Sequence, residues 1–286
     1  MFDWSAFDLP DEAFGDGKIT DWSIEKMKSH GAGKPFFLAV GFYRPHIPLY
    51  APKKYFDMYP LESIQLPDTI ADDLADVPVA GKERALNAVT AGTHAHVIKH
   101  KQWKHAVQAY LACISFVDHQ VGRLLDCLDE SQHADNTSVV LFSDHGWHLG
   151  EKQAWGKQSG WIHSTQVPLI ISGPQTGAGA LCGEPVSLLD LYPTLLEMAG
   201  LPSRDLDGVS LLPLLKNPSA STSRVVKTYV NADDYVLSGK RWRYIRYGDG
   251  SEELYDAQKD PRQYENLAGS DSHQKTITQL HDRLLN

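Results

Sequence analysis

The sequence predicts an α/β fold in which part of a mostly parallel sheet is flanked by helices and a small antiparallel sheet with one helix follows. Two apolar runs rich in β-branched residues, 137–142 and 167–172, predict buried strands. A long amphipathic segment precedes the first run, and alternating strands and helices are typical of parallel α/β sheets. After residue 221 the pattern changes to short runs separated by Asp, Gly and Ser. We therefore expect an α/β part over 1–221 and a small C-terminal subdomain over 222–286.

The first hundred residues predict short elements joined by polar segments. The residues from 19 to 30 predict a short helix, and the apolar run 36–41 predicts a strand. A second short helix is expected over 51–59. The acidic stretch 61–93 predicts a long loop, a length that is often functional or mobile in compact domains. The histidine-rich stretch 93–105 predicts a solvated loop and the start of the next helix.

The clearest predicted helix covers residues 102–130. Its apolar residues recur at alternating steps of four and three: Trp103, Val107, Tyr110, Ile114, Val117, Val121, Leu124 and Leu128. Such a continuous stripe indicates a helix docked on a sheet, which the strands predicted on both sides of it favour. The alternative is a coiled-coil dimer face, because the spacing also fits a heptad repeat.

Later elements follow in the same way. The strand 167–172 should carry its proline at its beginning or on an edge, and 190–198 predicts a helix. The C-terminal subdomain predicts short strands over 225–230, 235–237, 241–247 and 253–255, and a final helix over 273–285.

Composition indicates a globular chain and narrows the function classes. The 286 residues, 42% hydrophobic and 22% charged, can bury a core, and the net charge of −9 argues against nucleic-acid binding. No apolar run approaches the roughly 20 residues of a membrane helix, and the N-terminus has no signal-peptide pattern. Three cysteines make no disulfide framework. Cys113 and Cys127 should lie about 21 Å apart on one helix, too far to bridge.

The most informative stretch is SDHGWHLG, residues 143–150, which follows the strand predicted at 137–142. Asp144 and His145 thus stand at the carboxyl end of a strand, where open α/β sheets bind ligands. A carboxylate and an imidazole side by side can bind one metal ion, and ligand type alone allows manganese, magnesium or zinc. Lys157 follows Asp144 by thirteen residues and can place a charge beside an anion. The alternative is an ordinary Asp-His-Gly turn in which the glycine takes a positive φ.

The longer string resembles the sulfatases of the alkaline-phosphatase superfamily, and most closely the iduronate-2-sulfatase-like group. Further motifs occur in the family's order: KPFFLAVGFYRPHIP over 34–48, VSLLDLYPTL over 186–195, LDGVSLL over 206–212, and ELYD, DP and ENLA within 253–268. The resemblance implies an alkaline-phosphatase-like sulfatase fold. It also implies Ca²⁺ held by Asp144 and His145, sulfate bound by Lys157, and His46 acting as a general acid near the leaving oxygen. Arg44 is expected to contact an anionic sugar.

One family feature is missing from the sequence. Sulfatases carry Cys/Ser-x-Pro-x-Arg, whose first residue is oxidised to the formylglycine nucleophile, and none of the three cysteines here fits that pattern. An early Asp-Asp metal pair after a first strand is also absent. The chain therefore resembles the second part of a sulfatase. We expect it to be inactive alone and to associate with a complementing N-terminal segment or with itself. The resemblance suggests export, although this chain shows no signal peptide.

Three functions remain open from the sequence. The first is hydrolysis of sulfate esters on sulfated saccharides. The second is a phosphoester or phosphonate hydrolase of the same superfamily, and the third is a non-catalytic sulfatase remnant. His148, Glu151, Lys152 and Trp155 are expected to shape the substrate pocket, with Trp155 either stacking on a sugar ring or covering the core.

Overall fold

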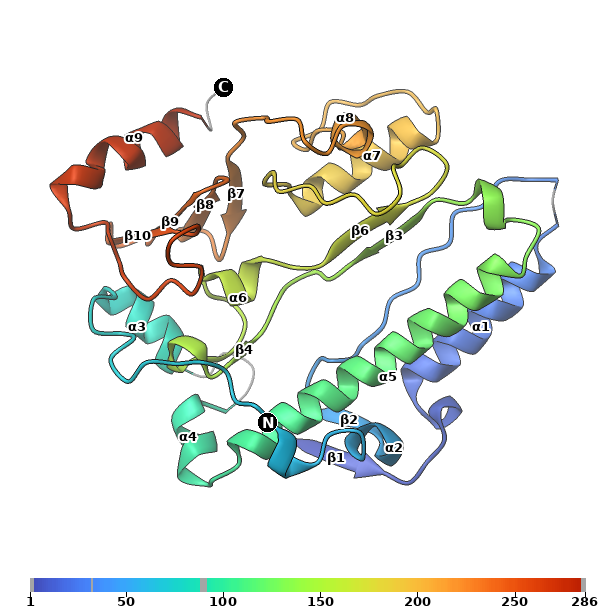
Figure 1. Cartoon of the computed structure of the whole chain (residues 1–286), viewed down its shortest axis with the longest axis horizontal. Helices are drawn as coiled ribbons and strands as arrows, with labels where there is room; N and C mark the ends of the chain where they lie inside the picture. The colour runs from blue at the N-terminus through green and yellow to red at the C-terminus, as the bar shows by residue number, and fades with distance from the viewer. Residues whose placement is uncertain (1–2, 32, 88–91, 284–286) are drawn as a thin grey trace. The chain divides into compact units, whose positions relative to one another are not determined.

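The computed structural model describes residues 3–31, 33–87 and 92–283 (Figure 1). The chain forms two compact units, one of Met1–Asp68 with Thr90–Thr137, and one of Thr69–Val89 with Ser138–Asn286. Residues 69–89 thus belong to the second unit although the first unit flanks them in the sequence. The predicted division after residue 221 concerns a subdomain of the second unit and stays a prediction.

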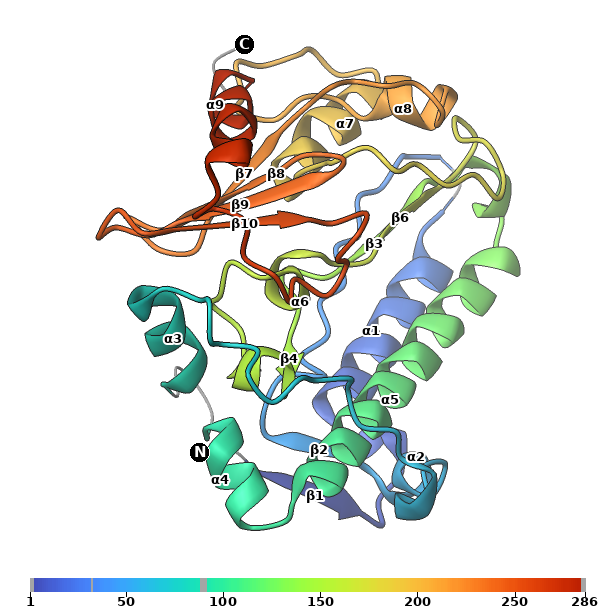
Figure 2. The same ribbon diagram turned by 60° about the vertical axis from the view of Figure 1, so that its left-hand side comes forward.

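The first unit is built on two long helices that lie side by side, α1 (Gly15–Ser29) and α5 (Trp103–Asp129) (Figures 1 and 2). A parallel pair of strands, β1 (Trp4–Phe7) and β2 (Leu49–Pro52), packs against α5. The short elements of this unit are η1 (Asp11–Ala13), α2 (Lys53–Phe56), η2 (Leu61–Ser63), α4 (His94–Lys99) and η3 (Ala134–Asn136). In the stretch predicted as a solvated loop, His94 is buried, with its ring edge-on to Trp103 at 4.6 Å.

Helix α5 confirms the predicted helix but buries a different face. The residues with no exposed surface lie beside the predicted stripe and are mostly small: Ala106, Ala109, Ala112, Cys113, Phe116 and Gln120. Of the stripe itself, Val107 and Leu128 are buried. Small side chains let α1 and the β1–β2 pair approach closely, which explains why this face faces the core. Within the predicted stripe Ile114 is 41% exposed, so the expectation that the whole stripe is core was wrong.

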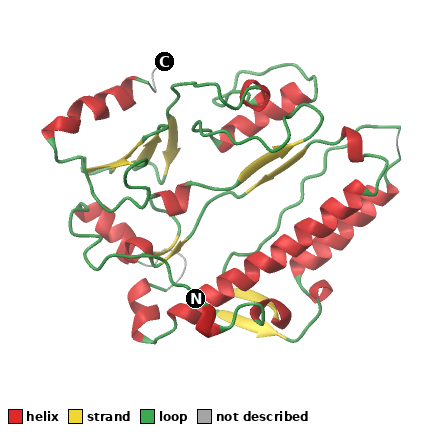
Figure 3. Ribbon diagram, in the orientation of Figure 1, coloured by secondary structure: helices red, strands yellow, loops and turns green. Residues whose placement is uncertain are grey.

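Two other expectations about the first hundred residues were wrong. Residues 36–41 form no strand, and the segment is drawn as loop after α1 in Figure 3. A strand needs a hydrogen-bonding neighbour, and no described strand pairs with this segment. The stretch 61–93 is not all loop, because it contains η2 and α3 (Val79–Leu86); its residues 88–91 lie outside the described part of the chain.

In the second unit the two predicted strands form as β3 (Val139–Phe142) and β6 (Leu169–Ser172), which pair with each other. None of their residues is buried, so the expectation of buried strands was wrong, because no element of the described chain covers the whole face of this two-stranded sheet. The pair is antiparallel, in contrast to the parallel β1–β2 pair of the first unit. No other described strand pairs with β3 or β6. Leu141 and Ile170 are directly opposite each other and 39% and 56% exposed, so this small sheet keeps an apolar face in solvent.

The C-terminal strands form the predicted antiparallel sheet. Its order is β10-β9-β8-β7, with β7 (Val226–Tyr229), β8 (Tyr235–Ser238), β9 (Trp242–Arg246) and β10 (Glu252–Asp256). Helix α9 (Gln274–Asp282) confirms the predicted final helix, and its Ile277 and Leu280 pack on one face of the sheet. The other short elements of the unit are β4 (His148–Leu149), η4 (Glu151–Gln153), β5 (Trp155–Gly156), α6 (Ile162–Thr165), η5 (Leu188–Asp190), α7 (Leu191–Met198), α8 (Leu212–Lys216) and η6 (Asp271–His273).

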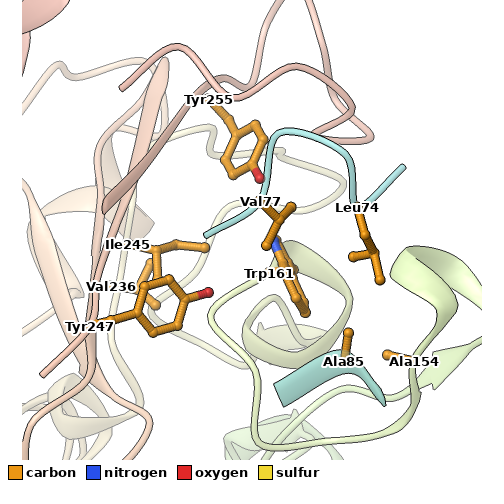
Figure 4. Packing of buried hydrophobic residues seen from close by; sticks show 9 residues of the cluster. All are labelled: Leu74, Val77, Ala85, Ala154, Trp161, Val236, Ile245, Tyr247 and Tyr255. Atoms are coloured by element: carbon orange, nitrogen blue, oxygen red, sulfur yellow. The ribbon is translucent and has the colours of Figure 1, made fainter. Parts of the chain in front are cut away.

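The opposite face of this sheet packs on Trp161, which lies between the sheet residues Val236 and Ile245 and residues from α3 and its approach (Figure 4). The carboxylate of Glu253 is completely buried beside it. Trp161 Nε1 donates to Glu253 Oε2 at 2.9 Å, and the hydroxyls of Tyr247 and Tyr255 donate to the same carboxylate. Three donors therefore compensate for removing this group from water.

Burial nevertheless raises the pKa of Glu253, although the three hydrogen bonds oppose this shift. A carboxyl whose pKa is higher in the folded state stabilises the fold most when it is protonated. That contribution is complete below the unfolded value of 4.5 and declines as the pH rises through the folded pKa.

We predict that Glu253→Gln, which imitates the neutral acid at every pH, becomes more stable relative to the wild type as the pH rises above 4.5. The difference in unfolding free energy should grow by at most about 1.4 kcal/mol per pH unit. Urea unfolding between pH 4 and pH 8 measures it. Glu252→Gln on the same strand, at a half-buried carboxylate, is the control. A difference for Glu253→Gln that does not change with pH would contradict the prediction.

Candidate active site

The turn after β3 places Asp144 and His145 at the end of that strand. The Ser143 amide donates to the Pro168 carbonyl at 3.4 Å, and the Ser143 hydroxyl donates to the carbonyl of His145 at 2.8 Å. The His145 amide in turn donates to Asp144 Oδ1 at 3.0 Å. These contacts fold the turn back on itself directly beyond the β3–β6 pair.

A hairpin then returns the chain to this turn and brings Lys157 onto His145. Strand β5 pairs with β4, with Gly156 opposite His148, and Lys157 follows directly. Lys157 Nζ lies 2.7 Å from His145 Nε2, and His145 Nδ1 lies 2.9 Å from the Gly146 carbonyl. Because an ammonium can only donate, His145 carries its proton on Nδ1 and accepts through Nε2.

Asp144 completes the group, with Oδ2 lying 3.5 Å from His145 Nε2. Its side chain is 81% exposed, whereas that of His145 is 31% exposed. The Asp144 carboxylate and His145 Nε2 thus lie side by side. Nε2 also accepts a hydrogen bond from the Lys157 ammonium, which is itself a cation. The structure brings together these three predicted residues, Asp144, His145 and Lys157, within the second unit.

This donor set fits one side of a divalent-cation site. Asp144 offers carboxylate oxygens that are open to solvent, and His145 offers a nitrogen with its lone pair outward. No group of three or more His, Cys, Asp or Glu side chains in the described part of the chain is arranged to hold a metal ion. The two donors of this turn would therefore need further ligands of other kinds, such as carbonyl oxygens or water, or carboxylates supplied by a partner.

A role of the loop residues His148, Glu151, Lys152 and Trp155 in a substrate pocket stays a prediction; Glu151 is half-buried. His148, Lys152 and Trp155 are all buried. His148 Nε2 lies 2.8 Å from the hydroxyl of Ser159, and burial lowers the pKa of His148 to about 3, which keeps the ring neutral. Trp155 covers the core, the second of the two roles open to it. Their apolar or paired surroundings explain why these side chains turn inward.

A buried ion pair fixes the same loop. Lys152 Nζ lies 2.6 Å from Asp73 Oδ1, and both side chains are almost completely buried. Lys152 adopts a left-handed backbone with φ of 53°, and its ammonium lies 5.4 Å from the Tyr255 ring centre. Burial raises the pKa of Asp73, while the hydrogen bonds from Lys152 oppose the rise. The loop that leads to Lys157 is thus held by residue 73 of the distant segment 69–89.

His46 lies in a tight turn of the first unit. The His46 amide donates to the Tyr43 carbonyl at 2.9 Å, and His46 Nδ1 lies 2.7 Å from the Ile47 carbonyl. Asp16 holds the approach to this turn, because its two oxygens accept from the amides of Tyr43 and Arg44 at 2.8 and 3.0 Å. No local sequence pattern marks Asp16 as part of this site; only its place in the first turn of α1, beside a glycine, could have drawn attention to it.

Arg44 supports the same turn with its side chain. Its Nε donates to the Tyr50 carbonyl at 2.7 Å and its Nη1 donates to the His46 carbonyl at 3.2 Å. Two of its donors thus hold the turn and the start of β2, and a contact with an anionic sugar stays a prediction. His46 and Arg44 belong to the first unit and the Asp144 group to the second, so their predicted convergence also stays a prediction.

The cysteines offer no nucleophile at either turn. Cys113 and Cys127 are buried, Cys182 is exposed, and all three are free thiols. Burial raises the pKa of Cys113 to about 12, which keeps it protonated at neutral pH.

Comparison with known proteins identifies the family. The family model described as "Sulfatase" matches residues 14–201, and the model "N-sulphoglucosamine sulphohydrolase, C-terminal" matches residues 150–286. The chain belongs to the sulfatase family. It is 41% identical over 271 residues to a sulfatase from Formosa agariphila, covering 94% of this chain and 53% of that protein. It is 36% identical over 231 residues to human iduronate 2-sulfatase, covering 68% of this chain and 41% of that protein.

Solved structures confirm the fold class. A phosphonate monoester hydrolase from Silicibacter pomeroyi matches with a TM-score of 0.82 at 24% identity, over 97% of this chain and 60% of that one. A 2-O GAG sulfatase matches with a TM-score of 0.78 at 23% identity, over 98% and 64%. The α/β sulfatase fold with a small C-terminal antiparallel sheet is thus established. The chain spans about half the length of the sequence relatives it matches. None of its described helices is long and apolar enough to cross a membrane.

We predict that Lys152→Met destabilises the second unit by about 3–5 kcal/mol, because it leaves the Asp73 carboxylate buried without a partner. Adding Asp73→Leu should recover most of the loss, since an apolar pair replaces an ion pair at little net cost. Lys53→Met, which breaks the exposed Lys53–Asp57 pair, is the matched control and should change stability little. Urea unfolding measures all variants; equal losses for the two lysine variants would refute the prediction.

Proposed function

We propose that this chain supplies one part of a sulfatase active site that hydrolyses sulfate esters, with sulfated saccharides as the favoured substrate class. The observation that carries the proposal is the Asp144, His145 and Lys157 group beyond β3 in a sulfatase-family chain. The similarity to iduronate 2-sulfatase and to a 2-O GAG sulfatase supports the substrate class.

Asp144 and His145 would hold a divalent cation, most simply Ca²⁺ as in the family. When bound, the cation would draw negative charge from the sulfate oxygens. A ligated His145 Nε2 no longer accepts from Lys157. The lysine side chain, which is long and flexible, then donates to a sulfate oxygen instead. Lys157 thus serves as the sulfate contact of the proposed site.

His46 is the proposed general acid. Its Nδ1 is engaged by the Ile47 carbonyl, whereas Nε2 has no hydrogen-bond partner among the described residues. Because the Ile47 carbonyl can only accept, Nδ1 carries a proton, and Nε2 would give a second proton, from the doubly protonated ring, to the leaving oxygen as the sulfur–oxygen bond breaks. The contacts of Asp16 and Arg44 keep this turn in place for that transfer.

The nucleophile must come from elsewhere, because no Cys/Ser-x-Pro-x-Arg motif occurs in the chain. A complementing sulfatase segment that carries formylglycine is the partner we propose, and the chain alone should be inactive. The second candidate is a phosphonate or phosphoester hydrolase. Its support is the structural likeness to a phosphonate monoester hydrolase and 27% identity to a multifunctional alkaline phosphatase superfamily protein from Trinickia caryophylli.

We predict that neither this chain nor the unmatched part of the Formosa sulfatase, expressed as a separate polypeptide, releases sulfate alone, whereas their mixture does. Asp144→Ala in the mixture should lower the rate at least about a hundredfold, since it removes a charged group at the reacting anion. Asp126→Ala, an exposed aspartate of α5, is the control. Aryl sulfate, a sulfated disaccharide and a phenyl phosphonate monoester are assayed in parallel.

The outcomes separate the candidates. Sulfate release by the chain alone that Asp144→Ala abolishes would show that it holds a nucleophile of its own. Turnover of the phosphonate without the sulfates would favour the second candidate. A mixture that binds but turns over nothing would favour a non-catalytic remnant.

The β3–β6 pair is the surface on which such a partner would add. Its outer edges pair with no described strand, and Leu141 and Ile170 present an exposed apolar face. Unpaired edges with apolar residues favour strand addition or association. The same surface would drive self-association when the partner is absent.

We predict that the purified 286-residue chain associates with itself in size-exclusion chromatography with light scattering, and that the Formosa segment suppresses this. Ile170→Glu should reduce self-association, because it places a charge on the exposed strand face. Leu181→Glu, at an equally apolar but almost fully exposed loop position, is the matched control. A sharp monomer peak with a cooperative melt at high temperature would show instead that the chain closes a complete core.

A further inference from the structure

Residues 159–166, here called the bridging segment, lie within the second unit between the C-terminal sheet and the turn that carries Asp144 and His145. The segment contains the short helix α6 and the buried Trp161. It is held from two sides, by the C-terminal sheet and by the Asp144–His145 turn.

On the sheet side two long side chains meet polar groups of the segment. Trp161 Nε1 donates to Glu253 Oε2 at 2.9 Å, and Arg243 Nη1 donates to Thr165 Oγ1 at 2.5 Å. Glu253 stands on β10 and Arg243 on β9, so neighbouring strands each fix one end of the segment.

The backbone of the segment also touches this sheet and the loop after it. The Ile162 amide donates to Gln263 Oε1 at 2.6 Å. A Cβ at Gly160 would lie 2.7 Å from a methyl carbon of Ile245, so only a glycine allows this approach. The sheet side of the segment is therefore closely packed and has little freedom to shift.

On the other side the backbone of the segment contacts the backbone of the turn. The Gly146 amide donates to the Ser164 carbonyl at 2.9 Å. A Cβ at Gly146 would lie 2.1 Å from the carbonyl oxygen of His163. Gly146 has no left-handed backbone, so its glycine is required by this contact and not, as the turn interpretation supposes, by a positive φ.

Arg243 is an unusual residue in this path. Its guanidinium is buried, and no Asp or Glu side chain of the described residues forms an ion pair with it. Burial lowers the pKa of Arg243 to about 10. A buried charge without an ion-pair partner is costly to the fold, so the guanidinium depends on its hydrogen bond to Thr165 Oγ1.

We propose that Arg243 is a positioning residue for the Asp144–His145 turn, acting through Thr165 and the bridging segment on Gly146. The C-terminal sheet thereby sets the place of the two candidate cation donors. This inference rests on the proposed function only in the role given to the Asp144–His145 turn. The contacts that lead from Arg243 to Gly146 involve no substrate or cation.

The test is amide hydrogen exchange of the full chain, followed residue by residue by NMR. Arg243→Met keeps the aliphatic stem and removes the guanidinium, and Thr165→Val removes the acceptor with little change in volume. Each should speed exchange at Gly146 about tenfold, while the amides of β8 and β9 stay unchanged, because local opening is separate from global unfolding. Arg246→Met is the matched control, on the same strand but paired with Glu252.

Thr165→Val removes the contact with Arg243 and also the hydrogen bond from Thr165 Oγ1 to the Trp161 carbonyl. The double variant Arg243→Met/Thr165→Val should therefore exchange at Gly146 no faster than Thr165→Val alone, because the Arg243 contact is already lost in that variant. Additive effects, an unchanged Gly146, or a rise shared equally with β8 and β9 would overturn the proposal. The readout needs no activity. If the reconstituted enzyme proves inactive while Gly146 responds as expected, the proposed function fails and the positioning role stands.

Discussion

The contact between the Gly146 backbone and the His163 carbonyl is the constraint on which the candidate site depends. With 2.1 Å between that oxygen and an ideal Cβ, any side chain at position 146 would force the turn and α6 apart. The Asp144 side chain itself is largely exposed and has few contacts of its own. The position of the turn is therefore set by the backbone of the bridging segment. The position of that segment is set in turn by its contacts with the C-terminal sheet.

The local sequence pattern was enough to predict Asp144 and His145, which follow a strand, and Lys157, which follows a hairpin. The apolar run before Asp144 does form β3, and the thirteen residues from Asp144 to Lys157 do fold back so that the lysine reaches His145. The C-terminal strands were equally clear, because each alternates between two packed faces and ends at turn residues. In both cases the deciding information lies within a few neighbouring residues.

What the sequence could not show is which partner each element finds. The run 36–41 has strand composition but no described strand pairs with it, and the α5 stripe is apolar but the smaller residues beside it allow the closer packing. Lys152 and Asp73, or Asp16 and the His46 turn, meet across long separations in sequence. From residue type alone, charged side chains such as these are expected to be exposed. They are buried here because each is paired with a partner that the sequence does not reveal.

The partners of the basic side chains also determine which of them is available to bind an anion in this acidic chain. Lys152 is neutralised by Asp73, and two donors of Arg44 bind the carbonyls of Tyr50 and His46. Lys157 remains, but its ammonium faces His145, with the carboxylate of Asp144 close to the same nitrogen. An anion approaching Lys157 would therefore meet Asp144 as well, and like charges in contact repel. A cation held by Asp144 and His145, as proposed above, would neutralise the carboxylate and release the lysine, and would thereby make this turn attractive to sulfate.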